Sequence, residues 1–195
     1  MTIRLTLAGL ALLLLAGCAT VPNPFAGRPV KPAAAAPATP AAPAPQASAA
    51  SVYMDKQETE LRTQLQGSGL SVTRVGNQIV LNLPAAIIFD GDKSVARPEA
   101  AATLAAIGLV LKHFDQTKVS VYGYTDAEGA ETDNRNLSQR RAVAVATALA
   151  NQGVDQSRFY IEGRGSADPI ATNTTDAGRA QNRRVEIQLT PTVKG

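Results

Sequence analysis

The stretch from Pro29 to Ala50, PVKPAAAAPATPAAPAPQASAA, divides this chain and limits where it can fold. Prolines spaced this closely break a helix and favour an extended, semi-rigid chain. The stretch also lacks any periodic apolar pattern, so it presents no face that a core could bury. From Val52 onward the composition becomes globular, which leaves most of the 195 residues for one domain with its own core.

The segment before this Pro/Ala-rich stretch, which we call the tether, has the layout of a secretory signal peptide. It contains Arg4, an apolar run and small residues at Leu15–Cys18. The apolar run is too short for a membrane-spanning helix, which needs roughly 20 apolar residues. LAGC resembles the lipobox of bacterial lipoproteins, which implies cleavage before Cys18 and acylation of its thiol. A plain signal peptide with a chance cysteine is the alternative. Because Ala19 replaces the Asp of inner-membrane lipoproteins, the resemblance implies an outer-membrane anchor facing the periplasm.

Cysteine and histidine usage limits the chemistry of the chain. Cys18 is the only cysteine, so no disulfide can form within the chain and the domain must be stable through its core alone. His113 is the only histidine, so no zinc or iron–sulfur ligand set exists, and we expect no metal and no cofactor. The 19 Lys and Arg residues barely outnumber the 16 Asp and Glu residues, which argues against a nucleic-acid partner.

Apolar periodicity and turn residues predict alternating helices and strands. A helix is expected over Val52–Gln66, followed by a hairpin of Ser71–Val75 and Gln78–Leu83. The later elements are a helix opened by Pro98 and running to Phe114, a strand at Lys118–Tyr124, a helix at Asn134–Gln152 ended by Gly153, a strand at Phe159–Gly163, a short helix at Gly178–Asn182 and a strand at Arg184–Leu189. This alternation predicts an α/β (α+β) sandwich, a mixed sheet with helices packed on one face and a βαβαβ-type core.

A charged pair stands out near the second crossover. Asp126 ends a predicted strand, and Arg141 lies about two turns into the next helix. Helical side chains tilt toward the helix N-terminus, so Arg141 can reach back toward the loop of Asp126. We therefore expect an anion and a cation a few ångströms apart in a shallow, solvent-facing cleft. A salt bridge that only ties loop to helix is the alternative.

Four short motifs contain or flank this pair. They are FDGDKS at 89–94, GYTD at 123–126, NRNLSQRRA at 134–142 and NRRVEI at 182–187. In order and spacing, the region from Ile88 to Leu189 resembles the OmpA-like peptidoglycan-binding domain of OmpA, MotB and the peptidoglycan-associated lipoproteins. Tyr124 stands where many members have His. Residues 53–84 are similar to YiaD-type outer-membrane lipoproteins, although the Pro/Ala tether replaces their glycine-rich segment.

The resemblance implies a ligand and a set of site residues. The family's ligand is the diaminopimelate of the peptidoglycan stem peptide, whose free end carries an ammonium and a carboxylate on one carbon. Asp126 would accept hydrogen bonds from the ammonium, and Arg141 would donate a pair to the carboxylate. The other implied site residues are Asp92, whose loop supplies backbone contacts, Asn134 and Leu137, which line the wall, and Arg183, which adds positive charge. Arg140 and Arg184 are expected to be solvated or packed against a helix.

The predicted organisation follows from these segments. It comprises a signal peptide at 1–17, the lipidated Cys and tether at 18–51, a helix and hairpin leading into the domain at 52–83, the OmpA-like domain at 84–190 and a tail at 191–195. The predicted function is an outer-membrane lipoprotein that binds peptidoglycan and tethers the membrane to the wall. An envelope signalling or partner-sequestering lipoprotein is the alternative. We expect no enzyme, because His113 and the loop carboxylates Glu128 and Glu131 form no recognisable catalytic set.

Overall fold

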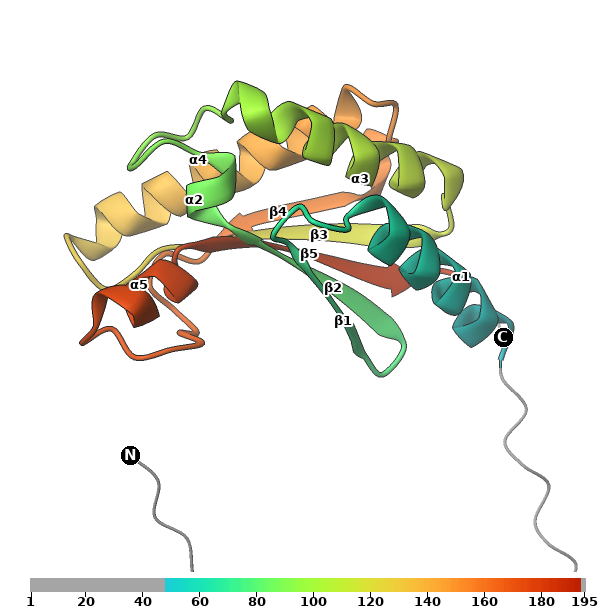
Figure 1. The fold of residues 1–195 in the computed structure, drawn as a ribbon, viewed down its shortest axis with the longest axis horizontal. Coiled ribbons are helices and arrows are strands. Elements are labelled where there is room, and N and C mark those ends of the chain that lie inside the picture. The colour runs from blue at the N-terminus through green and yellow to red at the C-terminus, as the bar shows by residue number, and fades with distance from the viewer. Residues whose placement is uncertain (1–47, 194–195) are drawn as a thin grey trace, which may run out of the picture. The chain divides into compact units, whose positions relative to one another are not determined.

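The computed structural model describes residues 48–193, and these form one five-stranded sheet with helices (Figure 1). The predicted signal peptide, Cys18 and nearly all of the tether lie outside the described residues. The elements in chain order are α1 (Ala49–Gln64), β1 (Ser71–Val75), β2 (Gln78–Pro84), α2 (Ala85–Ile88), a 3-10 turn (Pro98–Ala100), α3 (Ala101–His113), β3 (Thr117–Tyr124), α4 (Glu131–Ala150), a 3-10 turn (Gln156–Arg158), β4 (Phe159–Gly163), α5 (Asp176–Asn182) and β5 (Arg184–Pro191). Among these residues, no helix combines the length and hydropathy needed to cross a bilayer.

The sheet has the order β1-β2-β5-β3-β4, and only β3 and β4 pair in parallel. Alternate residues point to opposite faces, so Val121 and Ile187 are fully buried while Lys118 is exposed. Helices α1, α3 and α4 lie on the side that carries the buried set (Figure 1). This arrangement confirms the predicted mixed sheet with helices on one face.

Helix α1 begins earlier than the sequence predicted. The side chain of Ser48 accepts a hydrogen bond from the backbone N–H of Ser51 at 3.1 Å, which caps the helix at Ala49 rather than Val52. Residues 49–51 therefore belong to the helix and not to the tether. From Ile79 to Pro84, β2 pairs with β5, so the predicted leading segment and the predicted domain share one sheet.

Glycines on β3 and β4 let the first half of α4 lie close to the sheet. A Cβ atom added to Gly123 would stand 2.1 Å from the carbonyl oxygen of Ser138, and one added to Gly163 would stand 2.3 Å from the backbone nitrogen of Gln139. The hydroxyl of Ser138 accepts a hydrogen bond from the N–H of Gly165 at 2.9 Å. These contacts fix the start of α4 above the ends of β3 and β4, where the motif residues lie.

Candidate functional site

A pocket of about 690 Å³ lies where the end of β3, the start of α4 and the loop after α2 meet. We call it the charged pocket. It is lined by Ala85, Ala86, Gly91, Asp92, Thr125, Asp126, Glu128, Gly129, Asp133, Asn134, Asn136, Leu137, Arg140, Arg141 and Arg183. All six side chains predicted to bind ligand therefore border one pocket, although they come from four separate motifs. The sequence reasoning did not assign a role to Thr125, Asp133, Asn136 or Glu128; their only signal was a position inside or beside the motifs.

Asp126 is buried at the base of this pocket, with only 7% of its surface exposed. One carboxylate oxygen, Oδ2, accepts a hydrogen bond from Nη1 of Arg183 at 2.5 Å, and Oδ1 accepts one from the N–H of Glu128 at 3.2 Å. The ion-pair partner of Asp126 is thus Arg183 rather than the expected Arg141. The register explains the difference, because Tyr124 pairs with Arg184 across β3 and β5 and the residues just beyond meet.

Arg141 is buried, contrary to the expected solvent-facing position, and is only 1% exposed. Its Nη2 donates to the carbonyl of Gly91 at 2.5 Å, and its Nε donates to that of Lys93 at 3.1 Å. The loop after α2 therefore closes over Arg141, whose guanidinium also lies 5.3 Å from the centre of the Phe89 ring. Burial lowers the pKa of Arg141, while the nearby carboxylates of Asp92 and Asp126 act in the opposite direction.

Two buried polar atoms of pocket residues lack a hydrogen-bond partner among the described residues. They are Nη1 of Arg141 and Oγ1 of Thr125. Buried polar groups are normally satisfied, and each exception calls for an explanation such as a ligand. The pocket therefore holds a fixed cation with an unused donor, next to a buried carboxylate. That arrangement suits a small zwitterion, because each ligand charge would meet a protein group of opposite sign.

Amide side chains fix two loops, one that lines the pocket and one that precedes α5. Nδ2 of Asn134 donates to the carbonyl of Glu128 at 2.8 Å, which holds the loop after β3 against the start of α4. Asn182 accepts from the N–H groups of Ile170 and Ala171 at 2.9 and 3.0 Å, which orders the loop before α5. Asn182 belongs to the NRRVEI motif, but sequence reasoning gave it no role.

These observations can be set against known proteins. A family model described as the OmpA family matches residues 88–183. Residues 88–183 are a domain of the OmpA family. The match includes FDGDKS, GYTD and NRNLSQRRA in full and the first two residues of NRRVEI, so the resemblance drawn from the motifs is confirmed.

Relatives of this OmpA-family domain are found among lipoproteins and wall anchors. The probable lipoprotein YiaD of Escherichia coli K12 is 50% identical over 139 residues, which cover 71% of this chain and 64% of that protein. The chain thus spans less than two thirds of that relative. The cell wall anchor of the T6SS from Pseudomonas aeruginosa is 31% identical with a TM-score of 0.62, covering 69% of this chain and 96% of that one. The peptidoglycan-associated lipoprotein from Burkholderia pseudomallei is 29% identical with a TM-score of 0.51, covering 56% and 89%. These names describe lipoproteins and anchors rather than enzymes, in agreement with the prediction that the domain is not an enzyme.

Arg184, which directly follows the residues matched to the OmpA family, departs from its expected solvated or helix-packed position. It is 2% exposed, stacks 3.8 Å from the ring centre of Tyr124, and donates to Glu186 at 2.8 Å. The two residues lie on the sheet face opposite the helices, where the stack stiffens the ends of β3 and β5. Burial raises the pKa of Tyr124 to about 12, so its phenol stays neutral at physiological pH. Arg140 is exposed and borders the charged pocket.

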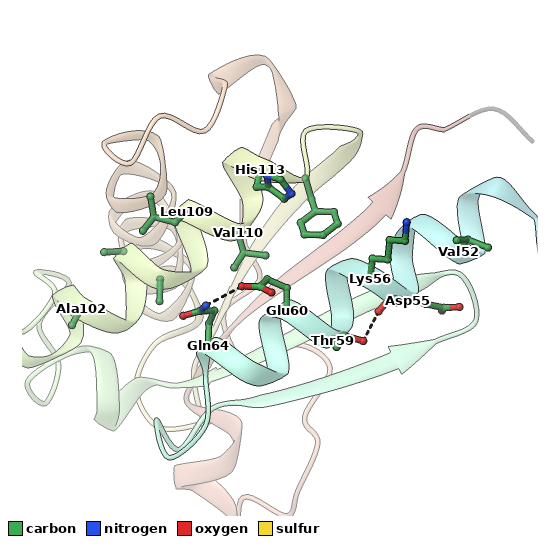
Figure 2. Close-up of a pocket in the computed structure, with 13 residues that line it drawn as sticks. Val52, Asp55, Lys56, Thr59, Glu60, Gln64, Ala102, Leu109, Val110 and His113 are labelled. Atoms are coloured by element: carbon green, nitrogen blue, oxygen red, sulfur yellow. Dashed lines mark hydrogen bonds between the residues drawn. The ribbon is translucent and has the colours of Figure 1, made fainter.

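The domain also has a second hollow, between α1 and α3, with a volume of about 900 Å³ (Figure 2). We call it the α1/α3 groove. Apolar residues of α3, including Leu109 and Val110, form one side, and polar residues of α1 form the other (Figure 2). Those polar groups bond within α1, since Gln64 donates to Glu60 at 2.9 Å. His113 lies exposed at the end of α3, as expected for a residue without a catalytic role. Across residues 48–193, no three His, Cys, Asp or Glu side chains group as a metal site requires.

Proposed function

We propose that the chain is an outer-membrane lipoprotein whose charged pocket binds the diaminopimelate of peptidoglycan non-covalently, and so tethers the outer membrane to the cell wall. The relatives described as a cell wall anchor and as a peptidoglycan-associated lipoprotein support the wall as partner. The YiaD likeness supports the lipoprotein assignment. The pocket supports the choice of ligand, because its charges match those of an amino-acid end.

The single observation that carries this proposal is the unused donor of Arg141. A buried donor without a partner costs roughly 1–3 kcal/mol, and a ligand carboxylate at Nη1 would remove that cost. Arg141 is already held by the carbonyls of Gly91 and Lys93, so it needs no rearrangement to receive a carboxylate. The first turn of α4 also borders the pocket, and the helix dipole favours negative charge there. The ligand ammonium would then bind the carboxylate of Asp126.

The direct test is sedimentation with purified sacculi that contain diaminopimelate. The wild-type domain should co-sediment, and Asp126→Asn should remain in the supernatant. His113→Ala, whose side chain lies in the α1/α3 groove, is the control and should co-sediment. Sacculi with lysine in place of diaminopimelate should retain much less protein. If the wild-type domain ignores both kinds of sacculi, the proposal fails and the alternative, a lipoprotein that holds a protein partner, gains support.

The membrane anchor is tested separately. If Cys18 is the acylated residue, labelled palmitate should enter the wild-type protein and fractionate with outer membrane. Cys18→Ser should remain uncleaved or become soluble, because the thiol that attacks the lipid is missing. A Cys18→Ser protein that matures normally and still carries label would refute the anchor without affecting the binding site.

A further inference from the structure

The carboxylate that the ligand ammonium needs is already occupied in the ligand-free protein. Asp126 has both oxygens engaged, one by the N–H of Glu128 and one by Nη1 of Arg183 at 2.5 Å. An incoming ammonium competes for the second oxygen. Ligand binding at this carboxylate is therefore an exchange of one cation for another, not the filling of an unused acceptor.

Two of the three arginines that line the pocket, Arg141 and Arg183, differ in how firmly they are held. Arg141 is 1% exposed and its guanidinium makes two hydrogen bonds to backbone carbonyls. The side chain of Arg183 is 37% exposed, and its bond to Asp126 is the only hydrogen bond of its guanidinium within residues 48–193. A long, half-exposed side chain with one anchoring contact can rotate away at modest cost. Arg183 is thus the cation that can leave Asp126, whereas Arg141 stays in place.

We infer that Arg183 acts as a displaceable counter-ion that makes the charged pocket selective for a ligand end carrying an ammonium and a carboxylate together. This inference rests on the proposed function. When the ammonium takes Asp126, Arg183 loses its ion pair with that carboxylate. A carboxylate on the same ligand carbon supplies a new anion, because it lies beside both Arg141 and the released Arg183. Arg141 and Arg183 are then both paired in the bound state.

A ligand with only an ammonium leaves the exchange incomplete. Its ammonium must either share Asp126 with Arg183 or displace Arg183 without returning an anion to it. Like charges in close contact disfavour binding, and this penalty falls selectively on simple amines. Arg183 would therefore be a specificity-determining residue that rejects lysine-type ends, in addition to any direct contact of Arg141 with the carboxylate.

The test compares two soluble tripeptides by calorimetry, Ala-γ-Glu-diaminopimelate and the same peptide ending in lysine. Against the wild-type domain, the diaminopimelate peptide should bind at least about tenfold more tightly than the lysine peptide. In Arg183→Gln, which has no cation at Asp126, the affinity for the lysine peptide should rise about threefold or more. The affinity for the diaminopimelate peptide should change less, so that the ratio of the two affinities shrinks.

Two further variants serve as controls for this comparison. Arg183→Lys keeps a cation beside Asp126 and should keep the wild-type ratio. Arg179→Gln removes another α5 arginine, which pairs with Glu128 at 3.1 Å without touching Asp126, and should also keep the ratio. Thermal melting of each variant checks folding. An unchanged or larger ratio in Arg183→Gln overturns the inference and leaves the proposed function intact. A wild-type domain that binds neither peptide refutes both.

Discussion

The charged pocket and the α1/α3 groove differ in a way that volume does not reveal. The groove is the larger, at about 900 Å³ against about 690 Å³. Some of its polar groups bond within α1, as Gln64 does to Glu60, and the facing side of α3 is mostly apolar. The pocket gathers charged groups from the first half of α4 and from the segments after α2, β3 and α5, and two of its buried polar atoms have no partner among the described residues. The proposed ligand site is therefore chosen for its converging charges and for the unused donor of Arg141, and not for its size.

The difference comes from how each hollow is built. The groove is a by-product of two helices that pack on the same sheet, so its lining repeats at helical spacing. The pocket combines one wall from α4 with the loops after α2 and β3, and loops at the end of a rigid scaffold can present varied side chains without disturbing the core. Its residues are held by second contacts, such as the bond from Asn134 to the carbonyl of Glu128 at 2.8 Å. Such support positions a ligand-binding group in advance.

The largest expected effect in the pocket is that of Arg141→Ala. The change removes the donor proposed for the ligand carboxylate, breaks two hydrogen bonds to the carbonyls of Gly91 and Lys93, and empties a fully buried site. Sacculus binding should be lost, and the free energy of unfolding should fall by about 2 kcal/mol or more. Urea denaturation and co-sedimentation on the same preparation measure both. A variant as stable as the wild type would show that the loop does not depend on Arg141.

Arg141→Lys separates the two roles of this residue. An ammonium can still reach one of the two carbonyls, so stability should recover in part. It cannot offer the flat, forked pair of donors, so binding should stay at least about tenfold weaker than in the wild type. Full recovery of sacculus binding by Arg141→Lys would contradict the proposed contact with the carboxylate.

Asp126→Asn comes next. It removes the charge that would hold the ligand ammonium, and charge-assisted hydrogen bonds of this kind contribute about 1.5–3 kcal/mol. Binding to sacculi should weaken about tenfold or more at roughly 1.4 kcal/mol per decade. The fold should persist, because the released Arg183 side chain is 37% exposed and can be solvated. Circular dichroism checks the fold. Wild-type binding by well-folded Asp126→Asn would move weight to the protein-partner alternative.

Much of the fold could be predicted because local patterns and packing agree. The hairpin at β1 and β2 followed from alternation around Gly76-Asn77, and β4 was predicted with its observed bounds. Helix ends were less certain, because caps depend on single side chains. Ser48 moved the start of α1, and α4 begins at Glu131, three residues before the predicted Asn134. The short α2 had no periodic pattern long enough to reveal it.

The membership of the pocket could be predicted from motif order, but its internal pairing could not. The ion-pair partner of Asp126 is set by the register of β3 against β5, which places Arg183 next to Asp126. This register depends on residues far apart in the sequence. The burial of Arg141 depends on a loop that lies 50 residues earlier in the chain, where the carbonyl of Gly91 accepts a hydrogen bond from the Arg141 guanidinium. The position of Arg141 in its helix predicts that it can approach the carboxylate of Asp126. It does not predict that Arg183 pairs with this carboxylate instead.

A smaller effect on stability is expected from Ser48→Ala. This substitution tests whether the groove and the pocket act independently. Ser48 caps α1, and α1 forms one wall of the groove. Losing such a cap typically costs about 1 kcal/mol, so the free energy of unfolding should fall by that amount. A fragment that starts at Val52 lacks this cap and the first three residues of α1. Its free energy of unfolding should be lower than that of a fragment starting at Ala47 by at least the same amount. Sacculus binding should not change in either case, because α1 contributes no residue to the charged pocket. Weaker binding by folded Ser48→Ala would link the two regions.

The smallest effect is expected from Leu109→Gln in the α1/α3 groove. Leu109 is 58% exposed, so a polar side chain of similar length should change stability by no more than about 0.5 kcal/mol. It touches neither of the buried atoms that lack partners in the charged pocket, so binding to sacculi and to the diaminopimelate tripeptide should stay within about twofold of wild type. Co-sedimentation and calorimetry would measure this. If Leu109→Gln weakened wall binding as strongly as Asp126→Asn, the larger hollow would have to take part in binding. Convergent charge would then no longer be sufficient to locate the site, because an apolar surface with internally bonded polar groups would contribute as much.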